Sequence, residues 1–325
     1  MTTASTTTPD TAREEAIDLA WNQYKDWAAD ARASQAATRS WNVVALLLAV
    51  LTAVLGALTS YFSGDSEVST SMGVLAAITS GIATYLGRNI FAERNEERWI
   101  EARRVAEAIK SEVFRYAGDS GVYSPAALAG QSAEHVLAAR IGKQSDGKQA
   151  PLRHTARSDQ KTCPPFPMSR EWYEQHRIQD QLDYYAKGQS RHASSIRRIE
   201  GVAAIGAIST IVLGALASRS PAYAPLVAAA TTAVAAIVAF GLLERRKAIA
   251  TSYGAMCSAL AWTKNIGRNL SLDALVAQIE DLLATEHGTW AVHMKQKTDQ
   301  STGGAQRTEV APQDTPLPNP PAGNP

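Results

Sequence analysis

The stretch WNVVALLLAVLTAVLGALTSYF, from Trp41 to Phe62, decides the fold, because it contains no Asp, Glu, Lys or Arg. Eleven of its residues are Val, Leu or Phe. A helix of this length spans the hydrocarbon core of a bilayer. At about −0.3 to −0.6 kcal/mol for each such residue, insertion gains roughly 3 to 7 kcal/mol. We therefore predict a membrane span at residues 41–62.

Three further charge-free segments complete two pairs of spans. A weaker one, Val68 to Gly87, follows after a short turn and marks a span at about residues 70–90. The other two, Gly201 to Ser218 and Ser220 to Leu243, mark spans at about residues 200–218 and 222–243. Each pair forms a helical hairpin in this interpretation. Helices that are apolar all round also occur inside large soluble domains, and in that alternative the four segments are buried in a protein core.

Positive charges flank the four segments on one side only. Within roughly twenty residues of each segment, the inner sides hold fifteen Lys or Arg, whereas the outer turns hold only Arg219. Because Lys and Arg are enriched on the cytoplasmic side of membranes, this distribution places both termini and the middle of the chain in the cytoplasm. We therefore expect a multi-pass membrane protein in contact with the lipid bilayer.

The chain contains an internal repeat. TAVLGAL at Thr52 to Leu58 recurs as TIVLGAL at Thr210 to Leu216, and both halves have the same order of polar helix, span, turn, span and polar helix. Because both halves enter and leave on the same side, they are parallel repeats, unlike the inverted repeats of many transporters. The predicted fold class is an all-α membrane protein with two parallel helical hairpins, four transmembrane helices in total, continued by long cytoplasmic helices.

Composition divides the chain into five regions. We expect disorder at residues 1–11 and 297–325, which lack the apolar residues needed for a core. The first hairpin repeat covers residues 12–118 and the second covers residues 169–288. A cytoplasmic linker at residues 119–168 joins them and contains one short helix around residues 126–141.

Apolar residues in the polar segments recur at helical spacing. Ile17, Trp21 and Tyr24 begin such a stripe in the first half, and Ser271 is placed to cap a last amphipathic helix that ends near Gly288. Stripes of this kind indicate that the polar helices pack against one another.

The motifs of common enzymes and cofactor-binding proteins are missing from the sequence. It contains no P-loop, no GxGxxG after a strand, no GxSxG and no HExxH. Two cysteines and six scattered histidines give no metal-binding spacing, and 32 Lys and Arg against 31 Asp and Glu argue against nucleic-acid binding. We therefore expect no enzyme, no catalytic residue, no metal and no cofactor. The spans also lack the ionisable groups that proton-coupled transporters place at mid-membrane.

Small and hydroxylated residues form ridges along three spans. They are Thr52, Gly56 and Thr59 in the first, Gly73, Ala77 and Gly81 in the second, and Gly206, Thr210 and Gly214 in the third. Such ridges let membrane helices pack closely. Alternatively, the hydroxyl groups line the lumen of a pore. The pore interpretation requires a homo-oligomer, because four spans are too few to surround a wide lumen.

Two polar stretches resemble the SLATT family, two-span effector domains associated with SMODS nucleotidyltransferases and SLOG sensors. The stretch ERWIEARRVAEAIKSEVFRY, Glu97 to Tyr116, is similar to the helix after the family's hairpin. The stretch REWYEQHRIQDQLDYYAKGQSRH, Arg170 to His192, is similar to the helix before it. This chain departs from the two-span form by carrying two hairpins, and its second half lacks the W-x-x-x-R-R-x-A-E-x-x-K pattern of the first.

The resemblance implies a bacterial inner-membrane effector, a homo-oligomeric gated pore or membrane-disrupting protein in nucleotide-signalled defence. Its trigger is then a nucleotide messenger or a nucleotide-sensing protein from a neighbouring gene. The implied signal-coupling candidates are Trp99, Arg103, Glu107, Lys110, Tyr173, Arg177, Asp180 and Gln181. Alternative functions are a non-conducting membrane anchor or scaffold and, after it, a small-molecule transporter.

The candidates in the first half allow two interpretations. Arg and Glu pairs at i and i+4 are common on ordinary solvated helices. If the helix instead continues the second span, a partner or ligand bound there shifts that span. The second half is then structural only, provided that Glu107 and Lys110 transmit the signal.

Overall fold

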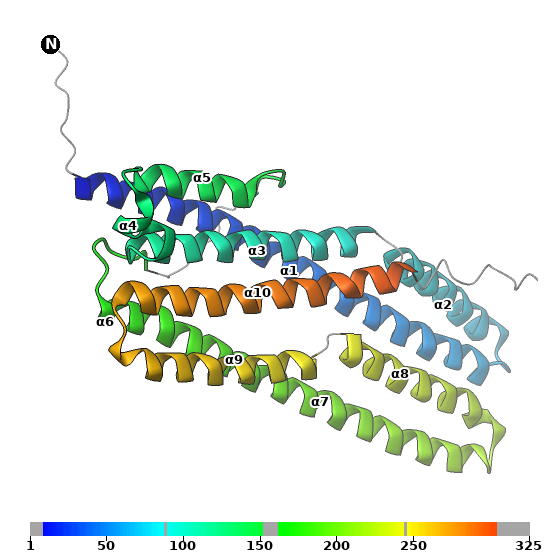
Figure 1. Ribbon diagram of the computed structural model, residues 1–325. Coiled ribbons are helices and arrows are strands. Elements are labelled where there is room, and N and C mark those ends of the chain that lie inside the picture. Colours follow the sequence, from blue (N-terminus) through cyan, green and yellow to red (C-terminus); the bar gives the residue numbers. More distant parts are fainter. Residues whose placement is uncertain (1–8, 88–89, 152–161, 244–245, 304–325) are drawn as a thin grey trace, which may run out of the picture.

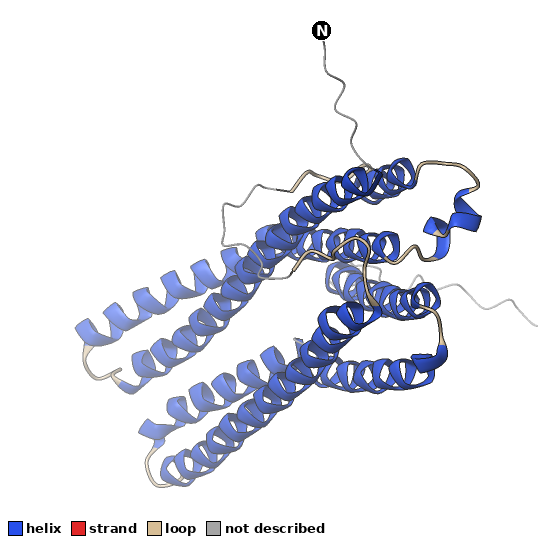
Figure 2. Ribbon diagram, turned by 90° about the vertical axis from the view of Figure 1, so that its left-hand side faces the viewer, coloured by secondary structure: helices blue, strands red, loops and turns tan. Residues whose placement is uncertain are grey.

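The computed structural model describes residues 9–87, 90–151, 162–243 and 246–303, and every regular element within them is a helix (Figure 2). The first half contains α1 (Pro9–Tyr61), α2 (Ser66–Gly87) and α3 (Ile90–Ala117). The connecting region contains η1 (Gly121–Tyr123), α4 (Pro125–Leu128) and α5 (Ala133–Ser145). The second half contains α6 (Arg170–Tyr173), the π-helix η2 (Glu174–Ile178), α7 (Gln179–Ala217), η3 (Pro221–Tyr223), α8 (Ala224–Leu243), α9 (Arg246–Ile266), η4 (Gly267–Asn269) and α10 (Leu272–Gly303).

Both halves are built in the same way. A long helix, α1 or α7, runs without interruption from the polar end into the apolar end, where a short turn leads to α2 or α8. The 53 residues of α1 give it a length of about 80 Å. A third helix, α3 or α9, then returns beside the polar part of the first. In Figure 1, α1 and α7 run in the same direction and both turns lie at the same end of the molecule.

The apolar segments of α1, α2, α7 and α8 are exposed. Each contains a stretch that is long and apolar enough to cross a membrane, and at most 6% of any such stretch is buried. Side chains such as Ile205 and Ile211 are 67% and 72% exposed. A soluble protein does not leave such faces to water, so the alternative of buried core helices is wrong. The chain is an all-α membrane protein.

The four spans stand in a row. Packing joins α2 to α1, α1 to α8, and α8 to α7, which leaves α2 and α7 at the two ends. At the turns, the rings of Tyr61 and Tyr223 lie 6.4 Å apart between centroids and connect the two hairpins. Only Ala57 and Ala229 are buried among the described span residues. The broad faces of this row are therefore free to contact lipid or other copies of the chain.

The remaining helices form a polar body with a core rich in aromatic residues. The predicted stripe of Ile17, Trp21 and Tyr24 is buried, and it packs against α3. Helix α10 contributes Leu275 and Ile279 to the same core. The polar helices therefore pack against one another through these apolar stripes, as the sequence periodicity predicts. In addition, α3 and α10 lie side by side and join the two halves (Figure 1).

The connecting region contains two helices where the sequence predicted one. Ser124 caps α4 through a hydrogen bond from the backbone N–H of Ala127, and Ser132 caps α5 in the same way from His135. Between these helices, Ala129 and Gly130 adopt left-handed backbone conformations, with φ values of 47° and 88°. A helix cannot continue through such residues.

The ends of the chain also differ from the expectation. Helix α10 passes through Gly288 to Gly303, because a glycine inside a helix costs only about 1 kcal/mol. It therefore covers the start of the tail expected to be disordered. Helix α1 begins at Pro9, and proline suits the first helical position. The other parts of the expected disordered regions, 1–8 and 304–325, lie outside the described residues.

Candidate functional site

A cavity of about 230 Å³ lies in the polar body where both halves meet. Helix α1 contributes Tyr24, Ala28, Ala31, Arg32 and Gln35, and α3 contributes Trp99, Arg103, Ala106 and Glu107. Gln181 and Tyr184 come from α7, and His287 comes from α10. The spacings on α1 and α3 place each set on one helix face. Because Ala28, Ala31 and Ala106 have small side chains, the helices pack closely yet leave space between them.

Arg103 connects the first half to the second across this cavity. Its Nη2 donates a hydrogen bond to the Tyr184 hydroxyl at 3.1 Å, and that hydroxyl lies 3.2 Å from the hydroxyl of Tyr253 on α9. Burial alone lowers the pKa of Arg103, but Tyr184, Tyr253 and Glu107 outweigh it and raise the pKa. The guanidinium therefore keeps its positive charge.

His287 is the neutral member of the cavity lining. Burial lowers its pKa, and the positive charges of Arg103 and Arg177 lower it further, whereas Glu107 and Glu286 act in the opposite direction. The net shift is downward from the ordinary value of 6.5. His287 is therefore uncharged at neutral pH, and the other acidic and basic side chains of the lining are Arg32, Arg103 and Glu107.

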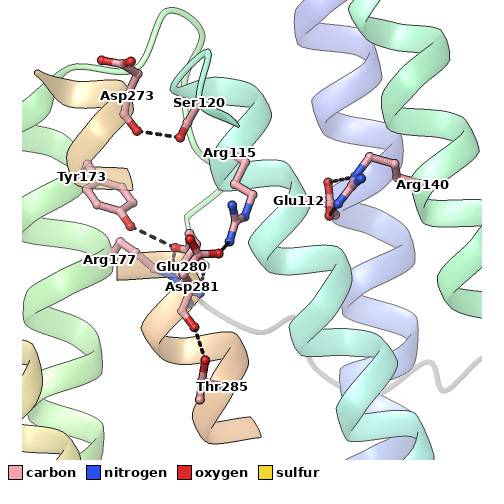
Figure 3. A network of polar contacts seen from close by, with 10 residues as sticks. All are labelled: Glu112, Arg115, Ser120, Arg140, Tyr173, Arg177, Asp273, Glu280, Asp281 and Thr285. Atoms are coloured by element: carbon pink, nitrogen blue, oxygen red, sulfur yellow. Dashed lines mark hydrogen bonds and ion pairs between the residues drawn. The ribbon is translucent and has the colours of Figure 1, made fainter. Parts of the chain in front are cut away.

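A buried ionic network lies next to the cavity in the second half (Figure 3). Arg177 donates to the two Glu280 carboxylate oxygens through Nε at 2.8 Å and Nη2 at 2.7 Å, and the Tyr173 hydroxyl donates to the same carboxylate at 3.0 Å. The Arg177 guanidinium also lies over the ring of Phe114 in α3, 4.6 Å from its centroid. Burial raises the pKa of Tyr173, and so does the Glu280 carboxylate, which keeps the hydroxyl protonated as a donor.

Further polar contacts join the helices around this network. Arg115 of α3 donates to Asp281 of α10 at 2.7 Å, and the Ser120 hydroxyl donates to the backbone carbonyl of Asp273 at 2.6 Å (Figure 3). Within the described part of the chain, no group of three or more His, Cys, Asp or Glu side chains is placed to hold a metal ion.

Residues 173–290 match the family of SMODS and SLOG-associating 2TM effector domain 1. They form a SLATT domain. Residues 23–127 match a different family, DUF4231, whose function is unknown. No curated protein and no solved structure matches the chain.

The SLATT domain is thus the second half, although its post-hairpin helix lacks the pattern seen in the first. The stretch that resembles a SLATT post-hairpin helix, Glu97 to Tyr116, lies in the segment matched by the DUF4231 family. The Arg177–Glu280 pair is internal to the SLATT domain, whereas Arg103 contacts that domain from outside. The cavity is built from both matched segments.

The structure brings most of the signal-coupling candidates together. Trp99, Arg103, Glu107 and Gln181 line the cavity. Tyr173 and Arg177 form the adjacent network, and Lys110 is buried with its ammonium group 5.6 Å from the centroid of the Tyr24 ring. Asp180 alone is exposed and lies outside both groups.

The helix that carries the first four candidates, α3, lies at an angle to the second span in Figure 1. The structure describes α2 up to Gly87 and α3 from Ile90. The unbroken connection to a span instead runs through α1, whose residues Tyr24 to Gln35 line the same cavity. These α1 residues, together with Tyr184, His287 and Glu280, were not predicted as site residues from the sequence. Glu280 could have been predicted, because it places a charged side chain on the apolar face of an amphipathic helix.

The small residues of the spans fall into two groups. Some pack within a hairpin: the Thr52 hydroxyl donates to that of Thr79 at 3.1 Å, Thr59 lies against Gly73, and Gly206 lies against Val234. Thr210 donates to the carbonyl of Gly206 in its own helix. The second group faces open space: a methyl group added to Gly56, Gly81 or Gly214 meets no atom within 4 Å, and Ala77 is exposed.

Proposed function

We propose that the protein is a non-catalytic effector of a bacterial inner membrane, with both termini in the cytoplasm. Its hairpins assemble from several copies into a gated pore, or disrupt the bilayer, in a nucleotide-signalled defence system. The observation that carries this proposal is the row of four exposed, charge-free spans attached to a polar body with a cavity. The match to an effector domain family supports it.

Assembly follows from the ends of the row. In the single chain, α2 and α7 each have one packed neighbour among the spans, whereas α1 and α8 have two. Contact between α2 of one copy and α7 of the next is head-to-tail, and repeated contacts of that kind form a ring when the rotation between copies closes on itself. The exposed Gly81 of α2 allows close approach of a neighbouring helix. Hydroxyl-bearing residues exposed on α8, Thr231 and Thr232, are then available to a lumen.

Signal transmission follows from the unbroken entry helices. Cavity residues on α1 and α7, such as Arg32 and Tyr184, belong to the same helices as the first and third spans. A rigid helix carries a shift at one end to the other. A nucleotide messenger, or a nucleotide-sensing protein, that changes the packing of the body therefore tilts these spans.

A non-conducting scaffold is the second candidate function. It is favoured by Trp262 and Ile266, which are one helical turn apart on α9 and are 66% and 55% exposed. Exposed apolar side chains of this size on the polar body suit a protein partner. A transporter is less well supported, because the described spans carry no ionisable groups.

Conductance of the purified full chain in planar bilayers tests the proposal. We expect discrete current steps once the messenger or the product of the neighbouring gene is added. Glu107→Gln, which removes a charge from the cavity, should abolish activation, whereas Glu97→Gln on the exposed face of the same helix should not. Oligomers that stay silent under every condition would favour the scaffold, and saturable flux of one solute would favour the transporter.

A further inference from the structure

We propose that the cavity between the two halves binds a small organic anion that carries a flat aromatic ring. The role of this cavity as the trigger site of an effector rests on the proposed function. Ligand binding itself can be measured without any current.

The ionised groups favour an anion. Two guanidinium groups, Arg32 and Arg103, face one carboxylate, Glu107, and His287 is neutral. Arg103 is fixed by its hydrogen bond to Tyr184, so its position is set before a ligand arrives. Arginine is suited to carboxylates and phosphates because its donors form a planar fork. Arg32 is exposed at the edge of the cavity, where an acidic group can remain partly hydrated.

The uncharged lining favours a ring. Tyr24, Trp99 and Tyr184 supply three aromatic side chains, and Gln35 and Gln181 supply amides that can donate and accept hydrogen bonds. Aromatic side chains bind flat ligands by offset stacking or by edge-to-face contact. Three alanines leave room for such a ring, because larger residues at Ala28, Ala31 and Ala106 would occupy the same space.

The size limits the ligand. A volume of about 230 Å³ is several times the roughly 30 Å³ that one water occupies, and it lies below the roughly 300 to 1,000 Å³ of sites for drug-sized ligands. A lone inorganic ion is too small to fill it. A single ring system with one acidic group fits, with the acid directed to the open edge at Arg32.

Equilibrium binding to the full chain in lipid nanodiscs tests the inference. The probes are adenosine monophosphate and benzoate, each a ring with an acid, together with adenosine as a ring without an acid and inorganic phosphate as an acid without a ring. We expect a ring-bearing acid to bind, and adenosine and phosphate to bind about tenfold more weakly or not at all. Binding of neither ring-bearing acid would overturn the inference. Equal binding of adenosine or phosphate would do so too.

Two variants locate the binding. Arg32→Gln removes an exposed charge without touching the core, and Ala28→Leu fills the cavity without changing charge. Both should weaken binding by about tenfold or more. The matched controls are Arg39→Gln on the same helix and Arg104→Gln beside Arg103, both exposed and outside the lining. Binding that survives both test variants lies elsewhere and would overturn the inference. A protein that binds the probe but never conducts would disprove the pore and leave the site intact.

Discussion

Arg177 and Glu280 form an ion pair with an Nη2 to Oε2 distance of 2.7 Å, and their side chains are 1% and 0% exposed. The two residues are 103 positions apart and join the start of the SLATT domain to α10. Desolvation makes such a pair weak as a source of stability, yet removal of one partner is costly because it leaves the other charged in the interior. The pair therefore fixes how α10 docks more than it adds to stability.

Arg177→Met should lower the free energy of unfolding by about 3–5 kcal/mol, because Glu280 loses its partner. The triple variant Arg177→Met, Glu280→Leu and Tyr173→Phe should recover most of this loss, since no donor or acceptor of the network is then stranded. Reversible unfolding in detergent, followed by circular dichroism, measures both. Lys187→Met, in the exposed pair with Asp183, should change stability by less than about 1 kcal/mol. A triple variant as unstable as the single one would contradict this account.

A comparison of two glycines separates packing within the chain from packing between chains. A methyl group at Gly206 would clash with Cγ2 of Val234, and one at Gly81 meets nothing within 4 Å. Overpacking should make Gly206→Ala about 1–3 kcal/mol less stable than Gly81→Ala, which meets no clash and gains up to about 1 kcal/mol of helix preference. Alanine has the same intrinsic helix preference at both sites. The difference in stability between the two variants therefore reports the contact with Val234 alone.

Thermal unfolding and native mass spectrometry in the same detergent distinguish the two effects. We expect Gly206→Ala to have a lower midpoint than Gly81→Ala, and Gly81→Ala to change the distribution of oligomers without lowering the midpoint. An unchanged distribution for Gly81→Ala would argue against assembly through α2.

Much of the fold could be predicted from the sequence, because it depends on local periodicity. Charge-free stretches such as Trp41 to Phe62 identify the spans, and stripes such as Ile17, Trp21 and Tyr24 identify the buried faces. These patterns involve residues that are close in sequence, so they can be recognised in a single sequence. The repeat of TAVLGAL also predicted two hairpins in the same orientation.

The candidate site was less predictable, because it depends on how distant helices align. Arg103 could be singled out by its helix, but its contact with Tyr184 requires α3 and α7 to pack in one register. The angle between α2 and α3 was also not predicted, since it too depends on how the helices pack. As a result, the connection from cavity to span was assigned to α3, whereas α1 is the helix described without a gap from the cavity to a span.

Arg140 and Glu112 hold α5 against α3 through two hydrogen bonds of 2.7 Å (Figure 3). The Tyr123 hydroxyl donates to the same carboxylate at 2.6 Å. Arg140→Lys should weaken this attachment, because an ammonium group cannot make both contacts at once. We expect amide hydrogen exchange in α5 to become roughly tenfold faster, with α1 and α3 unaffected. Lys143→Ala on the exposed side of α5 is the control. Uniformly faster exchange throughout the body would mean that α5 supports the whole core instead.

His287 predicts a specific loss of stability on acidification. Burial lowers its pKa below the ordinary value of 6.5, and Arg103 of α3 and Arg177 of η2 lower it further against the opposing charges of Glu107 and Glu286. The unfolded chain therefore takes up a proton near pH 6.5 while the folded chain does not. Since the unfolded state binds more protons, stability falls as pH decreases from about 6.5 towards the lower pKa of the folded protein.

His287→Gln should remove this part of the pH dependence, because glutamine stays neutral and can still donate a hydrogen bond. Unfolding midpoints measured from pH 7.5 to 5 should fall more steeply for the unmodified protein than for the variant. His135→Gln, at an exposed position on α5, serves as the control and should leave the profile unchanged. If His287→Gln kept the full acid sensitivity, the buried carboxylates of the body would be the groups that titrate. In that case the pKa of His287 would be the same in the folded and the unfolded chain, and burial in the cavity lining would not keep it neutral below pH 6.5.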